Sequence, residues 1–484
     1  MLERAMNLLS GTLSLIVAKA VFVLSGYALY SALSRFLSPS EFGVFLVVNG
    51  VVAVLNAVFI TGTVQAVSRL VASGEDGASV IRGAMRLQWR LAGSAVATYV
   101  ASAGVLAWLL NDPSLTALIR VSAVIPLAYA FYAVFVGYLN GRKQFGRQAS
   151  LDIAFSFIKP ALIVGAAMLG FGAAGAVGGF ALASLVIVTA AAVVVRPRDF
   201  GKTSFGLFEI FRFQVGVMAY VGVSNLLMQS DLMMVKALSP IESANAEVAM
   251  YGAAVKLAQV PYSLLVALNF VVFPLFARAV SERNTGLAAD YVGSGIHACL
   301  ALVAGPVAVL AALGPDLTEF VFGGPYRSAG SPLAVLVLGY AALSVLSLIL
   351  TMVNSAGRPY LSLGMVVATL ALQVALNSVL IPGEGIMGAA TGTSLALSAG
   401  CVTAVAYTRR QYGAAIPWRS LAGVMLSAAL VYWMGQQVIV REFGPVVGAA
   451  ALGMCYLLML GATGAVTTGD LARLRERRGP GLKA

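Results

Sequence analysis

The chain has 484 residues, of which 60% are hydrophobic and only 10% are charged. A soluble domain carries about 25% charged residues, so this composition excludes a soluble fold. A net charge of +12 would suggest a nucleic-acid partner in a soluble protein. Here the basic residues gather between apolar runs, where they indicate membrane topology, and no nucleic-acid partner is expected.

The apolar runs are about 20 residues long, enough to cross a hydrocarbon core about 30 Å thick. They are unbroken, as in 115–139 and 331–353, and lack the alternation of membrane strands. The sequence therefore predicts an all-α integral membrane protein of about fourteen transmembrane helices. The predicted spans are 12–34, 44–68, 87–110, 115–139, 149–170, 174–195, 213–237, 248–276, 289–313, 331–354, 360–381, 386–408, 418–438 and 444–467.

The distribution of basic residues predicts the orientation of these spans. With the N-terminus inside, 23 of the 31 Lys and Arg residues fall on cytoplasmic segments, five lie on or near outer segments and three lie within spans. This bias follows the positive-inside rule. We therefore expect a multi-pass protein of a bacterial inner membrane with both termini in the cytoplasm.

Two pairs of similar segments indicate an internal repeat. Gly141-Arg142 and a later Gly-x-Gly-x-x-Gly turn recur as Gly357-Arg358 and a second such turn. Leu37-Ser-Pro39 recurs as Leu238-Ser-Pro240. The offsets correspond to six spans, and an even number gives two lobes of the same orientation, related by a pseudo-two-fold axis along the membrane normal. We predict an N-lobe at 1–205, a C-lobe at 206–410, and two further helices with a basic tail at 411–484.

Motifs of nucleotide enzymes are excluded by their context. Gly170-x-Gly172-x-x-Gly175 has no preceding strand and no soluble βαβ unit around it. Gly201-Lys202-Thr203 resembles the end of a phosphate loop, but Arg196 stands where the first glycine belongs. The short loops leave no room for a catalytic domain. We therefore expect no enzyme activity, no catalytic residue, no metal site and no cofactor.

Ionisable residues inside predicted spans are the candidate functional residues, because such groups are costly in lipid and usually functional. Lys19, Lys159 and Lys256 lie in spans 1, 5 and 8, and favour an anionic substrate. Asp231 lies at nearly the same depth in span 7 as Lys256 in span 8, so we expect these two to form a pair. That pair is either a static salt bridge or a switch broken by a coupling cation or by substrate.

Other charged groups near span ends are expected to have no such role. Lys236, Glu247 and Asp152 are expected to reach the nearer interface by snorkelling. His297 is expected to be packed and neutral.

Several segments together resemble the polysaccharide-unit flippases of the Wzx type. The first is Leu37-Ser-Pro-Ser-Glu-Phe-Gly43, after span 1. Gln229-Ser-Asp231 and Tyr251-Gly-Ala-Ala-Val-Lys256 resemble the span 7–8 signature of that family. Further similar segments are Phe273-Pro274, Phe322-Gly-Gly-Pro-Tyr326, Gly385-Ile-Met-Gly-Ala-Ala390 and Thr467-Thr-Gly-Asp-Leu-Ala-Arg473. Their order and spacing, over nearly the whole chain, carry the resemblance.

The resemblance implies two six-helix bundles and two extra helices, within the multidrug/oligosaccharidyl-lipid/polysaccharide exporter superfamily. The implied activity is the movement of an undecaprenyl-pyrophosphate-linked oligosaccharide across the inner membrane by alternating access, for O-antigen, capsule or exopolysaccharide synthesis. Lys19, Lys159 and Lys256 would bind the substrate, and Asp231 would couple a proton or a sodium ion. Membrane lipid, a polymerase and glycosyltransferases are further candidate partners.

Four alternatives remain open at this point. A multidrug/cation antiporter of the same fold would need an acidic cavity, whereas the deep charges here are mostly basic. A membrane glycosyltransferase, polymerase or ligase would need a large catalytic loop. A flippase of peptidoglycan precursors and a membrane subunit of a synthase-dependent polysaccharide exporter both remain within the transporter class.

Overall fold

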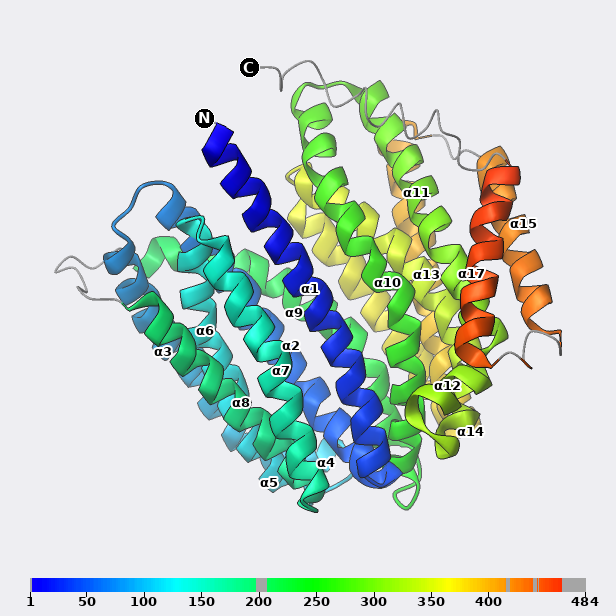
Figure 1. The fold of residues 1–484 in the computed structure, drawn as a ribbon, viewed down its shortest axis with the longest axis horizontal. Coiled ribbons are helices and arrows are strands. Elements are labelled where there is room, and N and C mark those ends of the chain that lie inside the picture. The colour runs from blue at the N-terminus through cyan, green and yellow to red at the C-terminus, as the bar shows by residue number, and fades with distance from the viewer. Residues whose placement is uncertain (1, 197–206, 415–417, 438–441, 443, 464–484) are drawn as a thin grey trace. The chain divides into compact units, whose positions relative to one another are not determined.

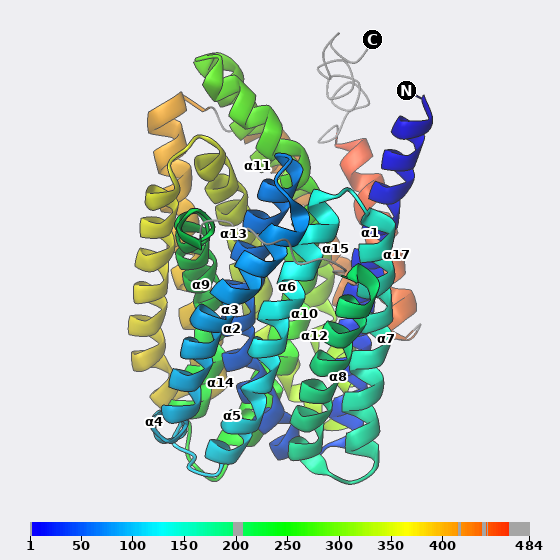
Figure 2. The same ribbon diagram turned by 90° about the vertical axis from the view of Figure 1, so that its left-hand side faces the viewer.

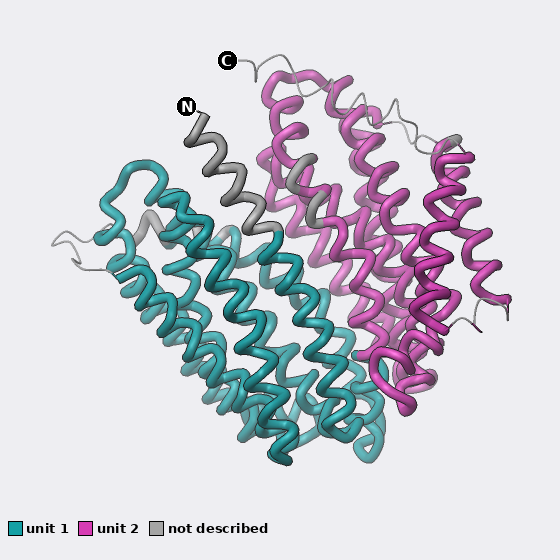
Figure 3. Tube along the Cα trace, viewed as in Figure 1, with its two compact units in different colours: residues 1–252 teal, residues 253–484 magenta. Residues whose placement is uncertain are grey.

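The computed structural model describes residues 2–196, 207–414, 418–437, 442 and 444–463. Within these ranges, side chains are described except at 2–16, 207–210, 212–214, 216, 266–267, 270–271 and 419. All regular elements in the described part are helices (Figure 1). Contacts divide the chain into two compact units, Met1–Gly252 and Ala253–Ala484 (Figure 3).

The first unit contains nine helices and the first turns of a tenth. They are α1 (Leu2–Phe36), α2 (Pro39–Ala72), α3 (Gly77–Ala101), α4 (Ala103–Leu109), α5 (Leu115–Ser122), α6 (Val124–Gly141), α7 (Phe145–Met168), α8 (Gly172–Val195), α9 (Leu207–Leu238) and the start of α10 (Ala244–Ser281). Helix α2 packs against α6 and α9, and α7 packs against α1 and α8. Figure 2 shows α2, α3 and α6 side by side.

The second unit contains the rest of α10 and the helices that follow it. They are α11 (Thr285–Ala312), α12 (Gly314–Phe322), the 3₁₀ helix η1 (Gly324–Ala329), α13 (Gly330–Ser355), α14 (Pro359–Tyr412), α15 (Trp418–Gly435) and α17 (Pro445–Ala462). Helix α13 packs on α14 and α11, while α15 and α17 both pack on α11. The hydroxyl of Tyr456 on α17 donates to the carbonyl of Ala301 on α11 at 2.8 Å. Helices α15 and α17, which overlap the last two predicted spans, therefore pack on α11, which contains most of predicted span 9.

The predicted all-α membrane fold is confirmed, and every predicted span overlaps a helix. Nine helices of the described part are long and apolar enough to cross a membrane, or ten if the bent pair α3–α4 forms one span. The count of fourteen stays a prediction. So does the division into lobes, whose first boundary, at 205/206, falls outside the described residues. The connection between predicted spans 9 and 10 forms α12 and η1.

Helix α14 contains two predicted spans, separated at Gly385. This glycine has φ 57° and ψ −133°, a backbone conformation that residues with a Cβ rarely adopt. The buried amides Gln373 and Asn377 before the break both donate to the hydroxyl of Thr393 after it, at 3.2 Å each. The break at Gly385 therefore allows the chain to reverse where a glycine-rich turn is predicted.

Close helix packing at one end of the first unit depends on a glycine of α2. The first turn of α2 is fixed by Ser38 and Glu41, whose side chains each bond the backbone amide of the other residue. Gly43 then lies so close to the start of α10 that a Cβ there would be 1.8 Å from the carbonyl oxygen of Asn245. A side chain at position 43 would force these two helices apart.

Replacing Gly43 with alanine should therefore destabilise the protein by about 1–3 kcal/mol, the usual cost of overpacking a close contact. Thermal unfolding of the purified protein in detergent measures this as a lower midpoint. Gly26→Ala is the matched control, because nothing lies within 4 Å of a Cβ at that position of α1. Equal midpoints for the two variants would contradict the close approach.

Candidate functional site

The structure places the four predicted site residues on four helices and in both units. Lys19 on α1 is exposed, Lys159 on α7 is half-buried, and Asp231 on α9 is only 1% exposed; all three belong to the first unit. Lys256 on α10 is half-buried and belongs to the second unit. A common cavity formed by these residues stays a prediction.

Lys19 faces an acid that sequence reasoning did not select. Helix α1 packs along α7, and the charge of Lys19 acts on the carboxylate of Asp152. That carboxylate accepts a hydrogen bond from the hydroxyl of Tyr132 at 3.1 Å and another from the side chain of Gln148. Asp152 is half-buried, so the expectation that it reaches water stays a prediction. Asp152 belongs to a polar cluster formed by α1, α6 and α7.

Lys159 lies beside an aromatic cluster of the same unit. Its ammonium nitrogen is 4.1 Å from the ring centroid of Phe180 on α8, a cation–π contact. The Phe180 ring lies 6.2 Å from that of Tyr129, which lies 6.4 Å from that of Tyr132. The cluster thus connects the surroundings of Lys159 with those of Asp152. A ring face holds a cation without neutralising its charge.

Asp231 is buried and bonded to a residue of the neighbouring helix. Its Oδ2 accepts a hydrogen bond from the hydroxyl of Tyr251 on α10 at 2.8 Å, and its Oδ1 accepts one from the amide of Leu232. Tyr251 is fully buried, so it lies in the core of the unit. The expected pair between Asp231 and Lys256 stays a prediction.

The expectation that Lys236 snorkels to water is wrong. Lys236 is only 2% exposed, and its ammonium contacts Asp112 Oδ2 at 2.9 Å and Asn245 Oδ1 at 2.6 Å. Asp112 lies between α4 and α5, and its other oxygen accepts hydrogen bonds from the amide and hydroxyl of Ser114. A buried charge is stable only when it is paired and hydrogen-bonded, and this pair provides both. The two contacts of Lys236 therefore link the end of α9 to the α4–α5 connection and to the start of α10.

The pair also sets the protonation of Asp112. Burial alone would raise the pKa of this carboxyl group, but the hydrogen bonds from Lys236 and Ser114 and the charge of Lys236 together lower the pKa below its usual value near 3.8. The carboxylate is therefore the form that the fold favours.

A second buried polar cluster lies in the second unit, formed by Gln373, Asn377 and Thr393 of α14. All three side chains are at most 3% exposed. Gln373 and Asn377 are four residues apart and so share one face of the helix. Two amide side chains four residues apart within an apolar run are the sequence feature that indicates this polar cluster. Their meeting with Thr393 depends on the reversal at Gly385, which residue type alone does not reveal.

Replacing Lys236 with methionine should destabilise the protein by about 1–3 kcal/mol, because the half-buried Asp112 carboxylate loses its charged hydrogen-bond partner. The measurement is the unfolding midpoint in detergent. Arg278→Gln is the control, since it breaks the exposed pair with Glu282 at 2.7 Å and should change the midpoint little. Similar losses for the two variants would contradict a special role for the buried pair.

The lowered pKa of Asp112 predicts a pH dependence of stability. An acid with a folded-state pKa below its unfolded value stabilises the fold fully above the unfolded value, and this stabilisation is lost as the pH falls through the folded value. The stability difference between the wild type and Asp112→Asn should therefore be largest above about pH 5 and shrink toward pH 3. Unfolding of both proteins across this range tests it. A difference that does not change with pH would contradict the assignment.

Solved structures of transporters share this fold. The chain is similar to the lipid II flippase MurJ in its inward closed conformation, with a TM-score of 0.74, 13% sequence identity, and coverage of 96% of this chain and 100% of that chain. It is also similar to a multidrug resistance MATE family transporter of the MOP superfamily in an inward-facing conformation, with a TM-score of 0.64, 16% identity, and coverage of 80% and 94%.

A third similar structure is a MOP superfamily transporter from Pyrococcus furiosus that is described as having a binding pocket of reverse polarity. Its TM-score is 0.59, with 16% identity and coverage of 84% of this chain and 96% of that chain. At these identities the likeness shows the fold.

The amino-acid sequence itself identifies the family. A search of curated proteins finds no match. The family model described as polysaccharide biosynthesis protein, however, matches residues 32–331, more than half of the 484 residues. The chain therefore belongs to the polysaccharide biosynthesis protein family and has the fold of MOP superfamily transporters.

Proposed function

We propose that this protein is a flippase that moves an undecaprenyl-pyrophosphate-linked oligosaccharide across the bacterial inner membrane, for the synthesis of a surface polysaccharide. Membership of a polysaccharide biosynthesis family and a transporter fold support this class of function. The charges in the first unit support an anionic substrate, and the pyrophosphate is the anionic part of the proposed one.

The observation that carries the proposal is the setting of Lys19. It lies in a helix that forms a candidate membrane span, it is exposed, and among the described residues no carboxylate lies within 4.0 Å of its ammonium. The carboxylate of Asp152 acts on it from farther away. A lysine in this setting is costly in lipid, and a bound anion would offset that cost. Charge-assisted hydrogen bonds make phosphate oxygens strong ligands for such a lysine.

Lys159 and Lys256 would extend this site. The cation–π contact with Phe180 holds Lys159 in place, and its ammonium would bind a second phosphate or an acidic sugar. Lys256 is half-buried on α10 and would contact the substrate from the C-lobe. The lipid tail would stay in the bilayer, because apolar chains have no reason to enter a charged cavity.

Asp231 would couple transport to an ion. Its carboxylate is buried and held by Tyr251. A proton or a sodium ion bound there would compete with the Tyr251 hydroxyl and change the contact between α9 and α10. Because energy must then come from an ion gradient, no bound cofactor is proposed.

Alternating access would require the Lys236–Asp112 pair to open. Asp112 belongs to the proposed N-lobe, at 1–205, and Lys236 to the proposed C-lobe, at 206–410, yet the two are in direct contact at 2.9 Å. With both termini in the cytoplasm, this contact would lie near the outer surface. Water would replace the pair when the lobes open outward.

Replacing Lys19, Lys159 and Lys256 together with alanine should abolish export of the polysaccharide, because each lost charge-assisted hydrogen bond weakens substrate binding by about 1.5–3 kcal/mol. Three such losses together correspond to at least ~1,000-fold weaker binding. The measurement is surface polysaccharide in a strain that lacks the native protein, with membrane levels of the variant checked by immunoblot.

The matched control carries arginine at all three positions, which keeps the charge, and it should retain part of the activity. Normal surface polysaccharide in the alanine variant would contradict the proposed site. Loss in both variants, with normal membrane levels, would show that lysine geometry and not charge alone is required.

A further inference from the structure

Two helices of the second unit carry uncharged polar residues at matching positions within apolar runs. We call six of them the polar track: Gln259, Tyr262 and Asn269 on α10, and Tyr340, Ser347 and Asn354 on α13. The three members on α13 follow one another at intervals of seven residues, about two helical turns, so they lie on one side of that helix. The same interval separates the last two members on α10.

The first part of the track joins the two helices. Nε2 of Gln259 donates a hydrogen bond to the hydroxyl of Tyr340 at 3.2 Å. The hydroxyl of Tyr262 lies 3.5 Å from Oγ of Ser347, and the rings of the two tyrosines contact edge to face with their centroids 6.5 Å apart. Such contacts are how polar residues usually hold membrane helices together.

The other end of the track has hydrogen-bonding capacity left over. Asn269 follows Tyr262 by seven residues and Asn354 follows Ser347 by seven, so the two asparagines lie at about the same level. Oδ1 of each is buried and accepts no hydrogen bond from the described residues, although both side chains are only half-buried. A buried acceptor without a donor is costly, and a donor from a ligand would remove that cost. Helix packing alone therefore does not explain the asparagines.

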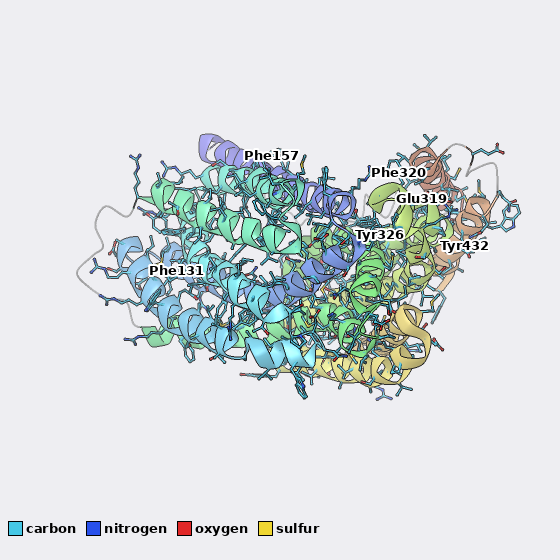
Figure 4. The ribbon with its side chains drawn as sticks, turned by 90° about the horizontal axis from the view of Figure 1, so that it is seen from below. Phe131, Phe157, Glu319, Phe320, Tyr326 and Tyr432 are labelled. Carbon is cyan, nitrogen blue, oxygen red and sulfur yellow. The ribbon has the colours of Figure 1, made fainter. Side chains whose placement is uncertain are left out.

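The end of α13 that is closed lies opposite the asparagines. Helix α12 and η1 pack on the start of α13. Tyr326 of η1, which Figure 4 labels, is 1% exposed, and its ring lies 5.9 Å from that of Phe322 on α12. Predicted spans 8 and 10 both run from the outer surface to the cytoplasm. The asparagines therefore lie toward the side from which the proposed substrate enters.

The chemistry of the track suits the sugar part of a lipid-linked oligosaccharide. Amide and hydroxyl groups exchange hydrogen bonds with sugar hydroxyls, and tyrosine combines an apolar ring with a polar tip. Lys256 lies three residues before Gln259, on the same side of α10. From Lys256 to Asn269 the helix covers about 20 Å, which is longer than one sugar ring. A cation beside a neutral polar track matches a pyrophosphate followed by several sugars.

We propose that the polar track binds the sugar hydroxyl groups of the substrate, and that Oδ1 of Asn269 and Oδ1 of Asn354 accept hydrogen bonds from them. The inference rests on the proposed flippase function. It assigns the sugars to α10 and α13, and it leaves the pyrophosphate to the lysines.

Binding of two lipids to the purified full-length protein tests this proposal. One is undecaprenyl pyrophosphate, which has no sugar, and the other is the lipid-linked oligosaccharide extracted from a strain that lacks the protein. The measurement is the apparent Kd from native mass spectrometry in neutral detergent. The double variant Asn269→Leu/Asn354→Leu should bind the oligosaccharide lipid about thirty-fold more weakly, the loss expected for two hydrogen bonds. Its affinity for undecaprenyl pyrophosphate should not change.

Gln436→Leu/Gln437→Leu is the matched control, because it removes two amides that follow α15, outside the track. It should bind both lipids within about twofold of the wild type, below the effect of one lost hydrogen bond. If the double track variant has a lowered unfolding midpoint, the single variants Asn269→Leu and Asn354→Leu replace it, with a loss of about fivefold each.

An unchanged affinity of the track variants for the oligosaccharide lipid would overturn the proposal. So would an equal loss for both lipids, because the asparagines would then not act on the sugars. A wild type that binds the two lipids equally would overturn it as well, and would leave the flippase function standing. A wild type that binds neither lipid would contradict the flippase function itself, and the proposal with it.

Discussion

Hydrocarbon cannot solvate a charge, and this constraint governs how the first unit is held together. Lys236 is buried only with Asp112 and Asn245 around it, and Asp231 only with the hydroxyl of Tyr251. Asp152 likewise has Tyr132 and Gln148. The Lys236–Asp112 contact joins segments 124 residues apart, and the hydroxyl contacts of Asp152 and Asp231 join neighbouring helices. Polar pairing, together with close packing at Gly43, therefore helps to determine which helices of this unit lie together.

Lys19 and Lys159 obey the same constraint in a different way. Lys159 is held over an aromatic ring, and Lys19 acts on a carboxylate that it does not contact. The paired charges therefore stabilise the fold, whereas Lys19 and Lys159 are the charges proposed to bind substrate. Their positive charge also favours an anionic substrate over the cationic drugs of a multidrug antiporter, although the two kinds of transporter share the fold.

Much of the fold is predictable from the sequence, because hydropathy depends only on residue type and run length. The helices that overlap the predicted spans, the reversal at Gly385 and the packing role of glycine follow from such local signals. The partners of charged residues do not. Lys236 near a span end looks like a snorkelling lysine, and only the fold brings Asp112, 124 residues away, to its ammonium. The same holds for Asp152, because its depth follows from the sequence but its neighbour Lys19 on α1 does not.

The account rests on the movement of a lipid-linked sugar, and reconstitution of the purified protein into liposomes tests this most directly. The liposomes would carry a fluorescent undecaprenyl-pyrophosphate-linked oligosaccharide, and a membrane-impermeant quencher would report how much label crosses the bilayer when an ion gradient is applied. The account predicts protein-dependent crossing of this lipid and no uptake of a cationic dye such as ethidium. Uptake of the dye without movement of the lipid would contradict it and identify a cation antiporter.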